Sequence, residues 1–472
     1  MHRIYGIYSV ILSILFIHVD SKAKRSARPK ACAYLESPRG GKYCIIVIRK
    51  PGQPDVKTTG LNMEEQQSIV TAARPLGENT SFKLFWGGRM FSGMAYQMNA
   101  VAVGWQIYAI TGKVFFLGLV GLAQFLPMFL LTLAVGHAAD RYNRRVIVFL
   151  CQLTQAACAL FLALGSFGGW LTKESILLTV TALGAARAFE GPTMSALMPG
   201  LVTEEQFPKA AALAASSMQT SFIIGPALGG VLYALGPGLV YSVSGGLLLA
   251  AAISVFLISH VHKSPKREPA TLRSVFAGIS FIRHKPEVLG AISLDLFAVL
   301  LGGATALLPA YAKDILRTGP WGLGLLRSSP AVGALLMSLY LLVRPLRARV
   351  GKIMFAAVGV FGLATILFAL SRSFWLSLSA LVVLGAADVI SVVVRASLVQ
   401  LKTPDNMRGR VSAVNSMFIG TSNQLGEFES GVTAAWFGLV PAVLIGGAGT
   451  ILVVLLWMRL FPELLNADKI EK

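Results

Sequence analysis

A succession of long apolar stretches, separated by short charged loops, constrains the fold of this chain more than any other feature. Residues 114–135 and 146–170 contain no charged residue, yet the segment between them, GHAADRYNRR (136–145), holds an aspartate and three arginines. About 20 apolar residues are enough to cross a bilayer core as an α-helix. β-Barrel strands are excluded, because they alternate in hydrophobicity at every second residue.

Twelve such stretches follow one another from residue 83 onwards, and each is predicted to be a membrane-spanning helix. They cover residues 84–110, 114–136, 146–170, 174–199, 210–235, 238–260, 287–312, 321–343, 353–371, 374–400, 411–436 and 438–459. Only 14 % of the chain is charged, whereas a soluble domain carries about 25 %. The composition therefore indicates an all-α membrane protein.

The net charge of +20 would suggest a nucleic-acid partner in a soluble protein. Here a simpler cause is available, because cytoplasmic loops of membrane proteins collect Lys and Arg. With residues 136–145 in the cytoplasm, most loop Lys and Arg fall on that side. We therefore expect an inner (plasma) membrane protein with both ends of the twelve-helix core cytoplasmic, surrounded by lipid, and no nucleic-acid partner.

The two halves of the core resemble each other. GPALGG (225–230) aligns with GEFESG (426–431), and GLAQFLP (121–127) aligns with GLLRSSP (324–330), at nearly constant offset. Such matches indicate an internal duplication. We predict five segments: an extension (1–82), an N-terminal half (83–262), a cytoplasmic linker (263–286), a C-terminal half (287–462) and a tail (463–472). The linker sequence TLRSVFAGISFIRH predicts a short amphipathic helix at the membrane surface.

The segment 136–145 resembles the G-x-x-x-D-R-x-G-R-R loop of the major facilitator superfamily. Asn143 replaces the second glycine of that pattern, and Asn tolerates a left-handed backbone. The matching residues are Gly136, Asp140, Arg141, Arg144 and Arg145. The ends of spans 4 and 10 are similar to the enterobactin-exporter and macrolide-efflux branch. The resemblance implies two pseudo-symmetric six-helix halves and secondary active transport by alternating access.

The same loop is a candidate gate. The Asp140 carboxylate can accept hydrogen bonds from a helix N-terminus, and the arginines can hold that carboxylate in place. The alternative is a loop that only fixes topology, for which the arginines alone suffice.

Charged residues inside spans cost about 2.5–3.5 kcal/mol each on insertion scales and are therefore functional candidates. RAFEG (187–191) resembles the superfamily's R-x-x-Q-G pattern, whose arginine the resemblance implicates in proton coupling. The candidates for proton coupling are Arg187, Glu190, Asp388, Arg395, Glu427 and Glu429. The repeat places Arg187 opposite Asp388, where the two could attract across a cavity. The alternative is an Arg187–Glu190 pair that neutralises itself.

Two further sets complete the candidates. Polar residues at helical spacing in span 1, and isolated charges in spans 7 and 8, predict a substrate cavity or, for span 1, a hydrogen-bonded helix seam. The cavity candidates are Arg89, Tyr96, Asn99, Gln106, Asp295 and Arg327. SFIIGPALGG (221–230) resembles the exporter motif G-x-x-x-G-P-x-x-G-G. Ser221 stands in place of the first glycine of that motif. Its motif residues are Gly225, Pro226, Gly229 and Gly230, and the alternative is ordinary small-residue packing.

The extension is open to three interpretations. The apolar stretch 4–19 is short for a span, and it is either a thirteenth span or an uncleaved signal. The interpretation we favour is a natural start at Met63, which would leave a short polar lead.

These features predict a proton-coupled exporter, or antiporter, of a small hydrophobic or amphipathic molecule such as a drug or siderophore, acting as a monomer. The chain has no G-x-x-x-x-G-K-[ST] loop for ATP, and the cysteines and histidines lack metal-ligand spacing, so no cofactor or metal is expected. One alternative is an uptake transporter or uniporter of the same fold. The other is a membrane assembly protein or membrane enzyme, although no H-E-x-x-H or G-x-S-x-G motif supports catalysis.

Overall fold

The structure is a computed structural model that describes residues 32–36, 42–46, 76–259, 272–346 and 348–467. A small antiparallel sheet, β1 (Cys32–Glu36) paired with β2 (Lys42–Ile46), lies within the extension. Met63 and the apolar stretch 4–19 lie outside the described residues. The natural start therefore stays a prediction.

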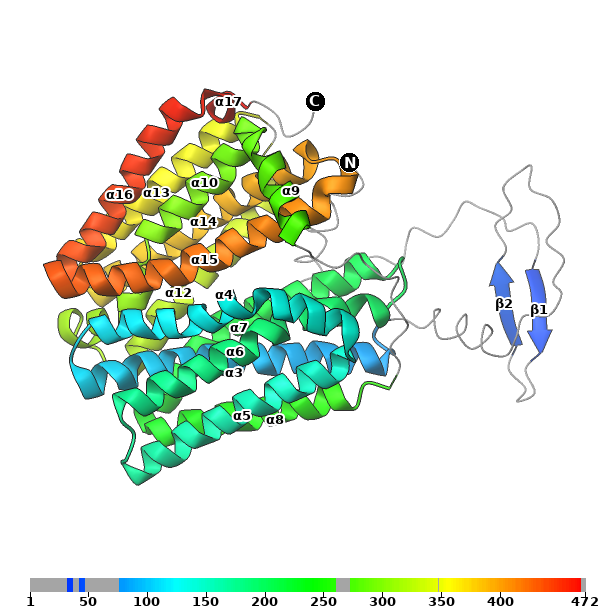
Figure 1. The fold of residues 1–472 in the computed structure, drawn as a ribbon, viewed down its shortest axis with the longest axis horizontal. Helices are drawn as coiled ribbons and strands as arrows, with labels where there is room; N and C mark the ends of the chain where they lie inside the picture. Colours follow the sequence, from blue (N-terminus) through cyan, green and yellow to red (C-terminus); the bar gives the residue numbers. More distant parts are fainter. Residues whose placement is uncertain (1–31, 37–41, 47–75, 260–271, 347, 468–472) are drawn as a thin grey trace.

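The remainder of the described chain is a bundle of long helices in two groups (Figure 1). The first group consists of α3 (Thr80–Thr111), α4 (Phe115–Arg141), α5 (Arg144–Gly168), α6 (Lys173–Leu197), η1 (Met198–Gly200), α7 (Phe207–Leu235) and α8 (Pro237–Phe256). The second consists of α9 (Leu272–Arg283), α10 (Pro286–Leu301), α12 (Pro320–Val343), α13 (Val350–Leu370), α14 (Phe374–Lys402), α15 (Asp405–Phe437), α16 (Leu439–Leu460) and α17 (Pro462–Leu465). The predicted all-helical membrane fold is confirmed.

Eight helical segments of the described chain are long and apolar enough to cross a membrane. α3, α6 and α15 are not among them, although they are long, because they carry more polar side chains. α4 contributes a shorter apolar segment, Phe115–Leu131. A span count of twelve therefore stays a prediction, and the more polar helices are those that bear much of the site described below.

Local sequence signals set where the helices begin. The Asn79 side chain accepts a hydrogen bond from the Phe82 N–H at 3.0 Å and caps α3. Thr172 and Ser175 form a capping box at the start of α6. Pro237 and Pro320 occupy the first turns of α8 and α12, where a missing N–H costs no helical hydrogen bond.

Span 7 is not the continuous helix that residues 287–312 predict. α10 ends at Leu301, and the chain continues as η2 (Ala304–Leu307), α11 (Leu308–Ala310) and a π-helical turn, η3 (Tyr311–Ile315). The cause is the Gly302–Gly303 pair. A methyl group built on Gly303 would lie 2.5 Å from the Gly426 carbonyl oxygen of α15, so the backbones are in direct contact there.

The predicted linker helix is present as α9. Ile282 is buried with Val288, Val411 and Val414, which are residues of α10 and α15, while Phe276 is exposed. α9 is therefore anchored on the C-terminal half by one face. Its placement at a membrane surface stays a prediction.

Helix contacts follow the predicted duplication. In the first group α3 packs on α7 and α8, α4 on α6, and α5 on α6 and α8. The second group repeats this pattern, since α10 packs on α15 and α16, α12 on α14, and α13 on α14 and α16. The turns match as well, because Gly236 and Gly438 connect equivalent helices with φ of 147° and 92°.

Two equivalent seams join the halves, α7 with α12 and α4 with α15. A methyl group built on Gly230 would lie 2.9 Å from the Gly324 Cα, and one built on Gly431 would lie 2.5 Å from the Gly118 Cα. Both crossings involve the last turns of α7 and α15 and the first turns of α12 and α4, so they lie at one end of the bundle. Figure 1 shows α4 and α15 running side by side between the two groups.

We predict that Gly230→Leu destabilises the protein, because overpacking a tight contact costs about 1–3 kcal/mol. The matched control is Gly246→Leu, at an exposed position of α8 where an added methyl group meets nothing within 4 Å. Thermal unfolding in detergent should show a lower midpoint for Gly230→Leu only. Equal midpoints for the two variants would contradict the close crossing.

Candidate functional site

The loop between α4 and α5 ties two helix ends of the N-terminal half together. An Arg144 guanidinium N–H donates to the Ala196 carbonyl of α6 at 2.9 Å. Arg145 donates to the Ile258 carbonyl just beyond α8, and its guanidinium lies over the Phe256 ring at 5.7 Å. Cations are favoured at helix C-termini, where carbonyls lack partners. Both arginines therefore have a structural role in this conformation.

Other parts of the gating loop stay predictions. Arg141, the last residue of α4, is exposed. The side chains of residues 136–140, which include Gly136 and Asp140, lie outside those that the structure describes. The role of Asp140 in the candidate gate therefore stays a prediction.

Asn143 does not use the left-handed backbone that the glycine of the pattern would allow. Asn143 has φ of −64° and ψ of 113°, and its side chain accepts a hydrogen bond from the Arg145 N–H at 3.0 Å. It is the N-cap of α5, a position that Asn favours because its carbonyl satisfies a free backbone N–H.

A buried carboxylate, Glu190, organises the N-terminal half. Its Oε1 accepts from the Ser92 hydroxyl of α3 at 2.5 Å and from Gln152 Nε2 of α5 at 3.0 Å. Its Oε2 accepts from Gln155 Nε2 at 2.8 Å and from the Arg187 guanidinium at 3.2 Å. A charged group in a membrane-embedded bundle needs this degree of satisfaction. Glu190 thus joins α3, α5 and α6.

Arg187 connects this centre to an aromatic ring. Its guanidinium lies over the Tyr96 ring, 4.3 Å from the centroid. The Tyr96 hydroxyl donates to Gln124 Oε1 of α4 at 3.0 Å. Both Arg187 and Tyr96 are half-buried, so the pair is partly accessible.

The polar side chains of α3 contact several neighbouring helices and do not form a single cavity wall. Besides the bonds of Ser92 and Tyr96, Gln106 Nε2 donates to the Ser166 hydroxyl of α5 at 3.1 Å. Asn99 is buried, and its Oδ1 has no hydrogen-bond partner. Arg89 reaches the Met218 sulfur of α7 at 3.7 Å. The helix-seam interpretation fits Gln106, whereas Arg89 and Tyr96 remain candidates for substrate contact.

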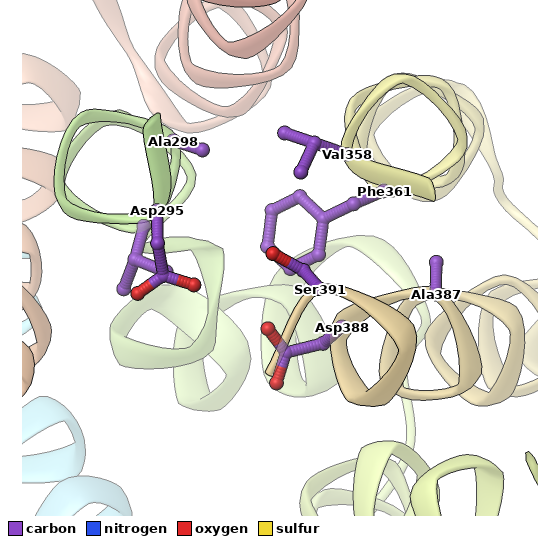
Figure 2. A pocket seen from close by; sticks show the side chains of 8 residues that line it. Asp295, Ala298, Val358, Phe361, Ala387, Asp388 and Ser391 are labelled. Carbon is purple, nitrogen blue, oxygen red and sulfur yellow. The ribbon is translucent and has the colours of Figure 1, made fainter. Parts of the chain in front are cut away.

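The C-terminal half contains a second buried ion pair, between Asp295 of α10 and Arg395 of α14. Asp388 lies two turns before Arg395 on α14, and Ser391 lies one turn before it. Together with Asp295 and Phe361, they line a cavity of about 10 Å³. Figure 2 shows Asp295 on a helix apart from the one that carries Asp388 and Ser391. The face of α14 predicted from spacing therefore meets α10.

Asp388, which is half-buried, differs from the buried acids Asp295 and Glu190. Within the described residues, it has no ion pair, whereas Asp295 is paired with Arg395 and Glu190 with Arg187. Arg187 and Asp388 form no ion pair with each other in this conformation. Their predicted attraction stays a prediction for another state.

Glu427 and Glu429 point to different surroundings, as their spacing predicts. Glu429 accepts a hydrogen bond from Thr433 at 2.6 Å. Glu427 packs against α4, since a methyl group built on Gly121 would lie 2.8 Å from its Cβ. Arg327 of α12 is close enough to act electrostatically on Glu427. Glu427, with Arg327 close enough to act on it, thus brings charged groups of the C-terminal half toward the N-terminal half.

The exporter motif lies where α7 crosses two helices. Methyl groups built on Gly225 and Gly229 would lie 2.7 Å from Gln97 Cβ and 2.9 Å from Met98 Cα, both on α3. Gly230, next in the motif, meets α12 as described above, and the Pro226 carbonyl also lies against α12, at Gly324. Small residues let α7 lie between the two halves.

Sequence reasoning missed the uncharged partners Gln124, Gln152 and Gln155. Outside span 1, the candidates were charged residues, and a glutamine is not charged. A weak signal existed, because Gln152 and Gln155 are one helical turn apart in an otherwise apolar span.

Two groups of helices that repeat their packing, with charged residues buried between long apolar helices, define the class as a major facilitator transporter. The chain belongs to the family described as "Transmembrane secretion effector", whose model matches residues 70–471. The predicted superfamily is therefore confirmed, and the protein is a multi-pass membrane transporter.

Curated relatives support efflux. The chain is similar to the enterobactin exporter EntS of Citrobacter koseri, with 28 % identity over 417 residues that cover 84 % of this chain and 96 % of the relative. It is also similar to EntS of Salmonella choleraesuis, with 25 % identity over 406 residues and the same coverage, 84 % and 96 %.

Solved structures share the fold. One is a bacterial homologue of the human lysosomal transporter Spinster, inward-facing and unoccupied, with a TM-score of 0.63 and 14 % identity over 82 % of this chain and 95 % of that chain. Another is a bacterial homologue of the iron transporter ferroportin in an inward-facing state, with a TM-score of 0.62 and 19 % identity over 81 % and 99 % of the chains. At these identities the likeness shows the fold alone.

We predict that Asp295→Ala lowers the stability by about 3–5 kcal/mol, because it leaves the buried Arg395 without a counter-charge. Glu287→Ala is a matched control. Glu287 pairs with Lys402 at 2.9 Å between the same two helices, but those side chains are 29 % and 39 % exposed, and exposed pairs contribute about 0–1 kcal/mol.

Unfolding in mixed micelles compares the two variants. The double variant Asp295→Leu with Arg395→Met should recover most of the stability that Asp295→Ala loses. A loss no greater than that of Glu287→Ala would show that the pair is not buried as described.

Proposed function

We propose that this transporter is a proton-driven exporter of a small hydrophobic or amphipathic molecule, acting by alternating access in a bacterial inner membrane. The relatives' printed activity, enterobactin export, makes a siderophore-like substrate a reasonable first candidate. The family membership supports transport, and the geometry of Asp388 supports proton coupling.

Asp388 is the observation on which the coupling proposal rests. A carboxylate without a counter-ion is costly to keep charged in a membrane interior, so the protonated form is favoured there. A cavity of about 10 Å³ lies beside it, at the lower limit of the space that one water needs. A water bound there would exchange a proton with the carboxylate without breaking a salt bridge.

Glu190 is a poorer proton carrier in this conformation. Donors from three helices satisfy both of its oxygens. Protonation would put an O–H where a bonded N–H or O–H already points, so at least one hydrogen bond would be lost. We assign Glu190 a structural role and Asp388 the proton.

Opening and closing would occur at the two glycine crossings. The halves touch there at one end of the bundle, and the polar residues lie between them farther along. Protonation of Asp388 changes the charge balance of the C-terminal half and so biases one arrangement of the halves over the other. The energy is adequate, since one proton crossing 100 mV yields about 2.3 kcal/mol.

We predict that Asp388→Asn lowers accumulation driven by the proton gradient at least tenfold, yet leaves exchange at equilibrium intact. Inverted vesicles loaded with or without a proton gradient measure both, with enterobactin and a drug panel as substrates. The matched control is Glu174→Gln, which removes an exposed acid from the first turn of α6.

Gradient-driven accumulation by Asp388→Asn at the unmodified rate would contradict the coupling role. Transport by the unmodified protein that is unchanged when the gradient is collapsed would instead favour a uniporter, and accumulation in the opposite direction would favour uptake.

A further inference from the structure

We propose that the ligand bound between the two halves is an organic anion with an aromatic part, held by Arg89, Arg187 and Arg327 around Tyr96. This rests on the proposed transport function and specifies the chemical class of its substrate.

Arg89 of α3 has a weak hydrogen-bond partner. Its guanidinium reaches the thioether sulfur of Met218, at 3.7 Å, and a thioether is a weak acceptor. Its Nε is buried with no hydrogen-bond partner. Within the described residues, no carboxylate forms an ion pair with it. Glu190 acts on Arg89 electrostatically, but this carboxylate already forms an ion pair with Arg187.

Arg327 is in a similar situation on the opposite half. It is half-buried on α12 and forms no ion pair in the part of the chain that the structure describes. Glu427 acts on it electrostatically, but the two groups are not in salt-bridge contact. A guanidinium without a salt bridge retains N–H donors for another acceptor.

Tyr96 lies between these charges. Arg187, Arg327 and Glu427 all act electrostatically on its hydroxyl, so cations from both halves are near one half-buried ring. Arg187 already covers that ring at 4.3 Å. A flat aromatic group could stack against the same guanidinium or against the free part of the tyrosine.

The local charge balance favours an anion. Three guanidinium groups, those of Arg89, Arg187 and Arg327, accompany two carboxylates, Glu190 and Glu427. Each uncompensated charge in a span costs about 2.5–3.5 kcal/mol, and a bound anion would supply the missing negative charge. Arginine forks bind carboxylates and similar groups with paired hydrogen bonds. A cationic ligand would add to the unbalanced positive charge.

The direct test is binding to the purified transporter in detergent, without any gradient. Fluorescein and rhodamine 123 share a xanthene ring system but carry opposite charges, so they separate charge from shape. We expect fluorescein to bind at least tenfold more tightly than rhodamine 123, and the difference to shrink as salt is added. Equal binding, or tighter binding of rhodamine 123, would overturn the proposal, and this comparison needs no variant to fold.

Variants then locate the site. Arg327→Gln and Arg89→Gln should each weaken fluorescein binding about tenfold or more, and Arg327→Lys should recover part of it. The control, Arg372→Gln, removes an exposed arginine between α13 and α14 and should bind as the unmodified protein does. Unchanged binding by both glutamine variants, with thermal midpoints like that of the control, would place the anion elsewhere and refute the assignment.

Transport in proteoliposomes keeps this test separate from that of the proposed function. Fluorescein binding without gradient-driven transport would leave the anion site standing and contradict proton-driven export. Gradient-driven transport of rhodamine 123 but not of fluorescein would do the reverse.

Discussion

The arrangement depends on two glycine-to-glycine crossings, Gly230 with Gly324 and Gly118 with Gly431, at which the halves meet without side chains between them. Backbones can approach this closely only where neither partner has a Cβ. The same contact occurs twice because the chain is duplicated, so the two seams form a symmetric junction at one end of the bundle. A junction without interlocking side chains can also separate without disrupting a packed core, which suits a transporter whose halves move.

The buried ion pairs lie within each half, whereas the glycine crossings join the two halves. Each half neutralises one acid internally, Glu190 with Arg187 and Asp295 with Arg395, and these pairs join helices within a half rather than across the junction. Within the described residues, the groups of the site left without such pairs include Asp388, Glu427, Arg89 and Arg327. Most charges that hold each half together thus differ from those that are free to bind a proton or a ligand, and Arg187 is the group that we assign to both roles.

Much of the fold could be predicted from the sequence, because hydrophobic length and spacing act locally. The helix over 374–400 follows from the length of its apolar stretch, and the linker helix follows from its amphipathic pattern. The break after Leu301 did not, since it depends on contact with Gly426 on a distant helix. The family pattern, which has glycine at this position, does not predict that the Asn143 side chain caps α5. The candidate charges were found, but the pairing of Asp295 with Arg395 joins helices about 100 residues apart, and no spacing rule specifies it.

The central claim is that the halves rock against each other, so that the end with the glycine junction opens as the opposite end closes. Spin-label distances in nanodiscs test it directly, in a variant whose four cysteines are replaced by alanine. One pair, Lys113→Cys with Arg372→Cys, spans the halves at the glycine end, and the other, Lys209→Cys with Arg344→Cys, spans them at the opposite end. All four positions are exposed. On changing pH or adding substrate, the account predicts that one distance distribution shifts to longer values while the other shifts to shorter ones. Distances that stay fixed, or that lengthen and shorten together, would contradict it.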